Sequence, residues 1–138
     1  MKSKRGLIYI AGGLFTSSER SYLEKLDKIC RLLGFDTYLP HREAGLFRVD
    51  TFDAQKIFKE DVAPLNKAKL LVAVIGGPDL ESGTAWEIGY AYAHGVPVFC
   101  IVDDIRINDP ERLNVMISGS TKVYFSLKEL TDGIKKIK

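Results

Sequence analysis

One acidic residue, Glu87, lies in a stretch otherwise built from small, aromatic and aliphatic residues, "SGTAWEIGYAYAHGVPV". Thr84 stands three residues earlier, which is the spacing of a capping box, in which a hydroxyl and a carboxylate satisfy backbone amides at a helix start. On spacing alone, capping is the favoured interpretation, because such boxes are common, and it places Glu87 in the first turn of a helix. The alternative is chemical: the helix dipole keeps the carboxylate ionised, and Gly83 and Gly89 leave room for a substrate.

An ionised, accessible carboxylate is a nucleophile for the anomeric carbon of a sugar. Retaining glycosyl transfer needs this group and a second acid or hydrogen-bonding group close by. The chain offers Asp61, Asp79 and Glu81 for that second role. Without further information, Asp61 is more typical of a solvated helix residue and Asp79 of a turn after Pro78.

The elements that must position these residues alternate along the chain. Continuous apolar runs predict buried strands, amphipathic runs predict helices, and single helices between strands predict parallel pairing with both sheet faces covered. We therefore expect a single α/β domain over residues 1–138, doubly wound and flavodoxin-like (Rossmann-like), with about five parallel strands. The expected strands are 6–11, 35–40, 70–75, 96–102 and 122–125. The expected helices are 16–33, one from about residue 52 that Pro64 limits or kinks, the one that carries Glu87, 114–118 and one that begins at Ser126. Capping-box spacing predicts two of these starts, through Thr16 with Glu19 and Ser126 with Glu129.

Ligands of such folds bind outside the carboxyl ends of the strands. Three segments meet there: "YIAGGLF" after the first strand, the irregular segment 41–51 after the second, and "GGPDLESGT" after the third. The glycines of "AGGLFTSSER" lack the G-x-G-x-x-G spacing, so a dinucleotide site is not expected. The third segment leads into Glu87 and is the most informative.

The composition excludes several classes of protein. A net charge of +2 with scattered basic residues argues against a nucleic acid partner, and no apolar run could span a bilayer, so we expect a cytoplasmic protein. Cys30 and Cys100 have no metal-ligand spacing and are expected to be buried thiols. His41 and His94 are expected to be ordinary surface or loop residues, and no metal or cofactor is predicted.

Several motifs in order resemble the nucleoside 2-deoxyribosyltransferase family over most of the chain. They are "YIAGGLF", "RVD" at 48–50, "KEDVAPLNKAKLLVAVIGGPDLESGTAWEIGYAYAHGVPV" and "LNVMISG" at 113–119. The resemblance reverses the preference for capping, because it implies that Glu87 is the nucleophile that forms a covalent deoxyribosyl intermediate. It also implies that Tyr9, at the end of the first strand, contacts and orients Glu87, and that Asp61 is a catalytic aspartate near the base and sugar.

The resemblance implies further substrate-binding positions: Gly12, Phe15, Asp79, Glu81, Ser82, Gly83, Asn114 and Met116. Asn114 and Met116 match residues that a neighbouring subunit contributes around the 5'-hydroxyl, so a homodimer or larger homo-oligomer is expected. Without the resemblance, Asn114 would be a helix cap and Met116 a core residue. Glu81 departs from the family, which usually has aspartate there, and its longer side chain alters the geometry of the site.

The resulting hypothesis is an enzyme that moves a 2-deoxyribosyl group between nucleobases with retention at C1'; its partners are a deoxynucleoside and a nucleobase. One alternative is a 2'-deoxynucleoside 5'-monophosphate N-hydrolase. Glu81 and Asn114 stand where those relatives tend to have phosphate-binding serines, and a carboxylate repels a phosphate. The hydroxyls and arginine of "TSSER" at 16–20 keep this alternative open. A second alternative is a non-catalytic nucleotide-sensing domain with the same pocket.

Overall fold

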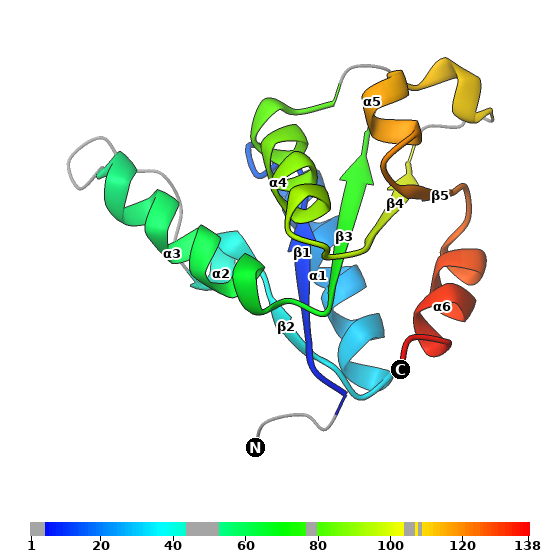
Figure 1. Ribbon diagram of the computed structural model, residues 1–138. Helices are drawn as coiled ribbons and strands as arrows, with labels where there is room; N and C mark the ends of the chain where they lie inside the picture. Colours follow the sequence, from blue (N-terminus) through cyan, green and yellow to red (C-terminus); the bar gives the residue numbers. More distant parts are fainter. Residues whose placement is uncertain (1–4, 44–52, 77–79, 104–106, 108) are drawn as a thin grey trace.

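The computed structural model describes residues 5–43, 53–76, 80–103, 107 and 109–138. Its centre is a parallel sheet of five strands in the order β2-β1-β3-β4-β5 (Figure 1). The expected doubly wound α/β domain with a flavodoxin-like strand order is confirmed. The strands are β1 (Leu7–Ala11), β2 (Asp36–Tyr38), β3 (Leu70–Ile75), β4 (Val98–Val102) and β5 (Lys122–Tyr124).

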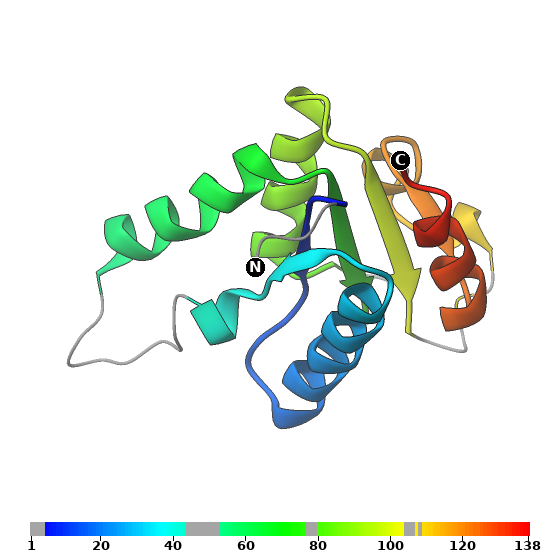
Figure 2. The same ribbon diagram turned by 90° about the horizontal axis from the view of Figure 1, so that it is seen from below.

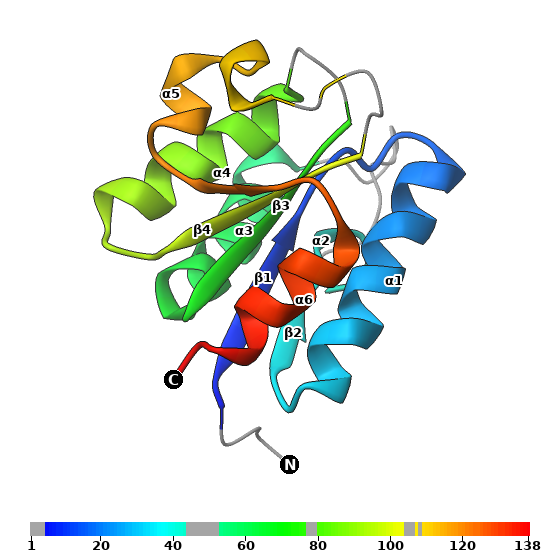
Figure 3. The same ribbon diagram turned by 90° about the vertical axis from the view of Figure 1, so that its right-hand side faces the viewer.

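Helices cover both faces of this sheet (Figures 2 and 3). One apolar core lies under α1 and α6, and a second lies under α3 and α4. Both faces are therefore buried, which explains the continuous apolar strands. The helices are α1 (Ser17–Leu32), α2 (Pro40–Glu43), α3 (Ala54–Lys67), α4 (Ser82–Ala93), the 3₁₀ turn η1 (Pro110–Arg112), α5 (Val115–Ser118) and α6 (Leu127–Lys135).

Helix ends follow the local chemistry in most places. Thr16 and Glu19 form the expected capping box of α1, and the Ser126 side chain caps α6. The chain leaves α1 at Gly34, whose φ of +93° is readily reached only without a Cβ. Helix α3 ends one turn after Pro64, as expected for a proline that limits a helix.

Strand β1 decides which residues reach each core. Ile8 and Ile10 point to the core under α1 and α6, whereas Tyr9 and Ala11 point to the core under α3 and α4. Tyr9 pairs in register with Tyr38 of β2 on one side and with Leu71 of β3 on the other. Because successive side chains of a strand point to opposite faces of the sheet, Tyr9 of β1 faces the core under α3 and α4.

The two cysteines were expected to be buried thiols, and the two histidines were expected to be ordinary surface or loop residues. Cys30 and Cys100 are free and buried, as expected, and burial raises their pKa to about 12 and about 11, so both thiols stay protonated. His94 is exposed, as expected. The expectation for His41 was wrong, because its side chain is 7% exposed and its Nε2 lies 3.2 Å from Glu24 Oε1. None of the described helices is both long and apolar enough to cross a membrane.

A buried carboxylate, Asp27, ties α1 to β2 and α2. It accepts a hydrogen bond from the Thr37 hydroxyl and forms ion pairs with Arg42 Nη1 at 3.0 Å and Arg31 Nε at 3.1 Å. Burial alone would raise the pKa of Asp27, but the hydrogen bonds from Thr37 and Arg42 outweigh it and lower the pKa below its ordinary value. The resulting stabilisation is present above the ordinary pKa and is lost as the pH falls through the folded-state pKa.

We expect Asp27→Asn to lower the free energy of unfolding by about 2 kcal/mol at pH 7, because it removes the charge from a buried hydrogen-bonded ion pair. The difference should shrink toward pH 3, because the Asp27 carboxylate of the unfolded wild-type chain is largely protonated below its ordinary pKa of 3.8. Urea unfolding at both pH values measures this change. Asp132→Asn is the control: its exposed carboxylate pairs with Lys128 at 3.3 Å, and its loss should cost less than about 0.5 kcal/mol. An equal loss at pH 7 and pH 3 would contradict the assignment.

Candidate active site

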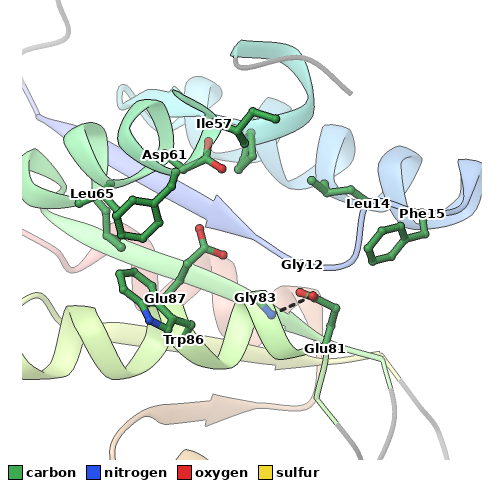
Figure 4. Close-up of a pocket in the computed structure, with 13 residues that line it drawn as sticks. Gly12, Leu14, Phe15, Ile57, Asp61, Leu65, Glu81, Gly83, Trp86 and Glu87 are labelled. Carbon is green, nitrogen blue, oxygen red and sulfur yellow. Dashed lines mark hydrogen bonds between the residues drawn. The ribbon is translucent and has the colours of Figure 1, made fainter. Parts of the chain in front are cut away.

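A cavity of about 410 Å³ opens at the carboxyl end of β1, between α3 and α4 (Figure 4). Its walls are mostly apolar, and three carboxylates, from Asp61, Glu81 and Glu87, lie among them. The described lining residues include no lysine, arginine or histidine. The apolar and glycine positions are Gly12, Leu14, Phe15, Pro40, Ile57, Phe58, Val62, Leu65, Gly83 and Trp86.

Helix α4 begins differently from the expectation. Its N-cap is Glu81, whose carboxylate accepts hydrogen bonds from the amides of Gly83 and Thr84, both at 2.8 Å, and from the Thr84 hydroxyl at 2.9 Å. The predicted capping box of Thr84 and Glu87 is therefore wrong. Glu81 displaces it because one carboxylate satisfies two amides at once, and Thr84 lies fully buried inside the helix. Glu87 is in the second turn of α4, not the first.

The carboxylate of Glu87 is held by a tyrosine instead of a backbone amide. The Tyr9 hydroxyl donates a hydrogen bond to Glu87 Oε2. Tyr9 is fully buried. The prediction that it stands at the end of the first strand was wrong, because it is the middle residue of β1. Burial is the main cause that raises the pKa of Glu87, the Tyr9 hydrogen bond opposes it, and the charges of Asp61 and Glu81 add to it, so that the pKa is about 7. Near neutral pH, Glu87 can therefore both lose and accept a proton.

Asp61 supplies the second carboxylate from α3. The Tyr38 hydroxyl donates to its Oδ1 at 2.8 Å, and burial raises its pKa in spite of this bond. Figure 4 shows the side chains of Asp61 and Glu87 directed into the same cavity. A nucleophilic carboxylate, a second acid and apolar walls for a planar ring are the parts that glycosyl transfer needs.

Comparison with known proteins agrees with this geometry. The profile of the nucleoside 2-deoxyribosyltransferase family matches residues 8–117, which is most of the chain. The chain belongs to this family. Comparison with curated protein sequences gives no significant match.

Solved structures show the same fold. A conserved protein from Enterococcus faecalis V583 is 29% identical, with a TM-score of 0.84 over 95% of this chain and 98% of that one. A 2-deoxyribosyltransferase from Bacillus psychrosaccharolyticus is 24% identical, with a TM-score of 0.76 over 96% and 92% of the two chains. The CMP N-glycosidase BcmB from Clostridium botulinum is 15% identical, with a TM-score of 0.61 over 93% and 96%. The deoxyribosyltransferase fold is thus shared by enzymes described as a transferase and as a glycosidase.

The remaining positions that the family resemblance implied fall into two groups. Gly12, Phe15, Glu81 and Gly83 line the cavity with Glu87, whereas the exposed Ser82 at the start of α4 does not. The expectation for Asp79 concerns a position outside the described residues, as does that for "RVD" at 48–50.

Asn114 and Met116 lie away from this cavity within the same chain. They line a separate groove between α4 and α5. Asn114 caps α5 through a hydrogen bond from the Met116 amide at 2.9 Å. The alternative of a core methionine was wrong, because Met116 is 76% exposed.

The residues that sequence reasoning missed are Tyr38 and the apolar walls other than Phe15. Phe58 and Trp86 meet edge to face, with ring centroids 5.3 Å apart, and both remain about half exposed. In the sequence, these two residues are aromatic positions within expected helices. A helical pattern alone does not separate an aromatic residue of a cavity wall from one of the core. Tyr38 could have been found from the expected pairing of the first two strands, which sets it beside Tyr9.

The raised pKa of Glu87 has a consequence for stability. In the unfolded chain Glu87 ionises near its ordinary pKa of 4.5, whereas the folded protein holds the proton to about pH 7. The ionised form therefore lowers the free energy of unfolding as the pH rises through this window. We expect Glu87→Gln to be more stable than wild type by about 2 kcal/mol at pH 8 and nearly equal at pH 4.5. Urea unfolding at the two pH values tests this, and a variant destabilised at pH 8 would contradict it.

Proposed function

We propose that this protein transfers a 2-deoxyribosyl group from one nucleobase to another through a covalent intermediate on Glu87. The observation that carries the proposal is the Glu87 carboxylate, bound by the Tyr9 hydroxyl inside an apolar cavity that also holds Asp61. Carboxylates with perturbed pKa values cluster at functional sites, and burial in this cavity raises the pKa of Glu87 to about 7.

The reaction divides into two displacements. A Glu87 oxygen attacks C1', the C1'–N bond breaks, and the departing base takes its electron pair and a proton from Asp61 or from water held there. A nitrogen of the acceptor base then attacks C1' from the face that the first base left, and the ester bond to Glu87 breaks. The proton of the acceptor returns to the acid. Two inversions give retention, and no metal or organic cofactor takes part.

An unphosphorylated deoxynucleoside fits the charge of the cavity better than a monophosphate. The described lining carries three carboxylates and no basic side chain. Two groups of "TSSER" are also engaged elsewhere: Thr16 caps α1, and Arg20 donates to the Leu14 carbonyl at 2.8 Å. Within this described lining, a phosphate would meet carboxylates without a compensating cation. The N-hydrolase is therefore the second candidate, supported by the fold shared with a CMP N-glycosidase.

We also propose that a second copy of the chain completes the site with Asn114 and Met116. Both residues are exposed in one subunit, beside the exposed Val115 and Tyr92 on the groove between α4 and α5. Exposed apolar residues around a groove favour a protein partner. In a homodimer or larger homo-oligomer, a neighbouring subunit would cover this groove, and the Asn114 side-chain amide would reach the sugar bound in the neighbouring site. We propose the cytoplasm as its location.

Incubation with deoxyinosine and adenine, followed by chromatography, separates the candidate functions. Deoxyadenosine formed together with hypoxanthine supports the transferase. Free base released only from a 2'-deoxynucleoside 5'-monophosphate supports the N-hydrolase. Nucleoside binding with neither product would support a sensing domain and overturn the proposal.

A further inference from the structure

Two carboxylates of the cavity lining are each bound by a tyrosine that does not itself line the cavity. Tyr9 of β1 donates to Glu87 of α4, and Tyr38 of β2 donates to Asp61 of α3. The two tyrosines are register partners on adjacent strands, and their rings stack with centroids 5.1 Å apart and an interplanar angle of 27°. Each carboxylate thus has its own phenol, and the sheet fixes one phenol against the other.

The Tyr38 hydroxyl has a single proton to donate. It lies 2.8 Å from Asp61 Oδ1 and 3.1 Å from the Glu60 carbonyl, and the carboxylate is both nearer and the stronger acceptor. Such a bond favours the ionised carboxylate. It also occupies one oxygen of Asp61 and leaves the other for a bound base.

We propose that Tyr38 is a positioning residue of the reaction, which acts through Asp61. Its hydroxyl and the hydroxyl of Tyr9 act in opposite directions on which of the two carboxylates, Asp61 or Glu87, holds a proton. Tyr9 favours ionised Glu87, and Tyr38 favours ionised Asp61. The transfer needs both states of Asp61, since it donates a proton to the departing base and takes one from the acceptor. Tyr38 keeps Asp61 able to lose its proton in surroundings that otherwise hold it. This inference rests on the proposed transferase function.

Among the residues that the structure describes, the charged and titratable groups that act on this arrangement are acidic or phenolic. Glu43 of α2 and Glu60 of α3 act on Tyr38, and Glu60 also acts on Asp61. Glu81 and Asp61 act on Glu87. Burial and these charges favour the protonated carboxyls, so the two phenols are the influences that oppose them. Removing either phenol should therefore favour protonation of the carboxylate that it binds.

Tyr9→Phe and Tyr38→Phe are predicted to act in opposite directions on Glu87. Tyr9→Phe removes the bond that favours ionised Glu87, so the pKa of Glu87 rises above about 7. Tyr38→Phe favours protonated Asp61, and a neutral Asp61 no longer repels the charge on Glu87, so the pKa of Glu87 falls. A purely structural role for Tyr38 predicts no such reversal.

The test combines the pH profile of kcat/KM for exchange with carboxyl-carbon NMR titration of the whole substrate-free protein. Tyr38→Phe should move the acid limb and the Glu87 titration down by about half a pH unit and lower the rate at pH 8 by about tenfold. Tyr9→Phe should move both upward. Tyr124→Phe is the control, since it removes the hydroxyl of a core tyrosine on the opposite face of the sheet and should leave the pH profile and the exchange rate unchanged.

A Glu87 titration that stays in place in Tyr38→Phe, or moves upward, overturns the inference. Asp61→Asn gives a second measurement: it should itself lower the pKa of Glu87, and adding Tyr38→Phe should cause no further shift. A further shift in the double variant would show that Tyr38 acts without Asp61. NMR titration needs no turnover, so the absence of exchange in wild type would sink the proposed function while the titrations still judge Tyr38.

Discussion

Replacement of Glu87 by glutamine is expected to lower the rate of deoxyribosyl exchange by about 10⁴-fold or more. The amide keeps the size of the side chain and can still accept a hydrogen bond from Tyr9, but it cannot form the ester with C1'. Because the variant is also expected to be more stable than wild type at pH 8, lost activity cannot be attributed to unfolding. Exchange between deoxyinosine and adenine at pH 8 measures the effect.

The covalent step can be observed directly. Intact-protein mass spectrometry of wild type mixed with deoxyinosine should show the added mass of one deoxyribosyl group, whereas Glu87→Gln should show none. Glu129→Gln, in the first turn of α6 on the opposite face of the sheet, should retain wild-type exchange. If Glu87→Gln kept more than about a hundredth of the wild-type rate, the covalent mechanism would be wrong.

The helix starts show how far local spacing can be used. The hydroxyl and carboxylate spacing correctly predicted the starts of α1 at Thr16 and of α6 at Ser126, yet the same spacing failed at Thr84. The spacing states only that a cap is geometrically possible. At α4 an earlier carboxylate, Glu81, takes two amides and the Thr84 hydroxyl, so the helix begins before the predicted box.

The fold and the site residues differ in how far along the sequence the information that predicts them is spread. Continuous apolar strands were sufficient for the fold, because both faces of a parallel sheet are covered. Glu87 and Asp61 were found through motifs, and the structure brings both to one cavity. Tyr38 and the pair of Phe58 and Trp86 were missed, because their roles follow from strand register and from contacts between α3 and α4 that no local pattern contains.

Asp61→Asn is expected to lower exchange by about 10²–10³-fold, the range of general acid catalysis. Asparagine keeps the shape of the side chain and can still meet the Tyr38 hydroxyl, but it has no proton to give to the departing base. The defect should therefore depend on the base. A 2'-deoxynucleoside whose purine is methylated at N7 releases a neutral base without protonation, so the loss of base release should fall to about tenfold or less with this substrate.

Asp132→Asn is the matched control for Asp61→Asn, because it makes the same chemical change at an exposed carboxylate of α6, away from the cavity lining. Its effect on both substrates should be less than about threefold, since a partly exposed charge is well screened. Release of the base, followed by absorbance, gives the rate of the first displacement alone. If Asp61→Asn impaired the methylated and unmethylated substrates equally, Asp61 would hold the substrate in place and would not be the acid that protonates the base.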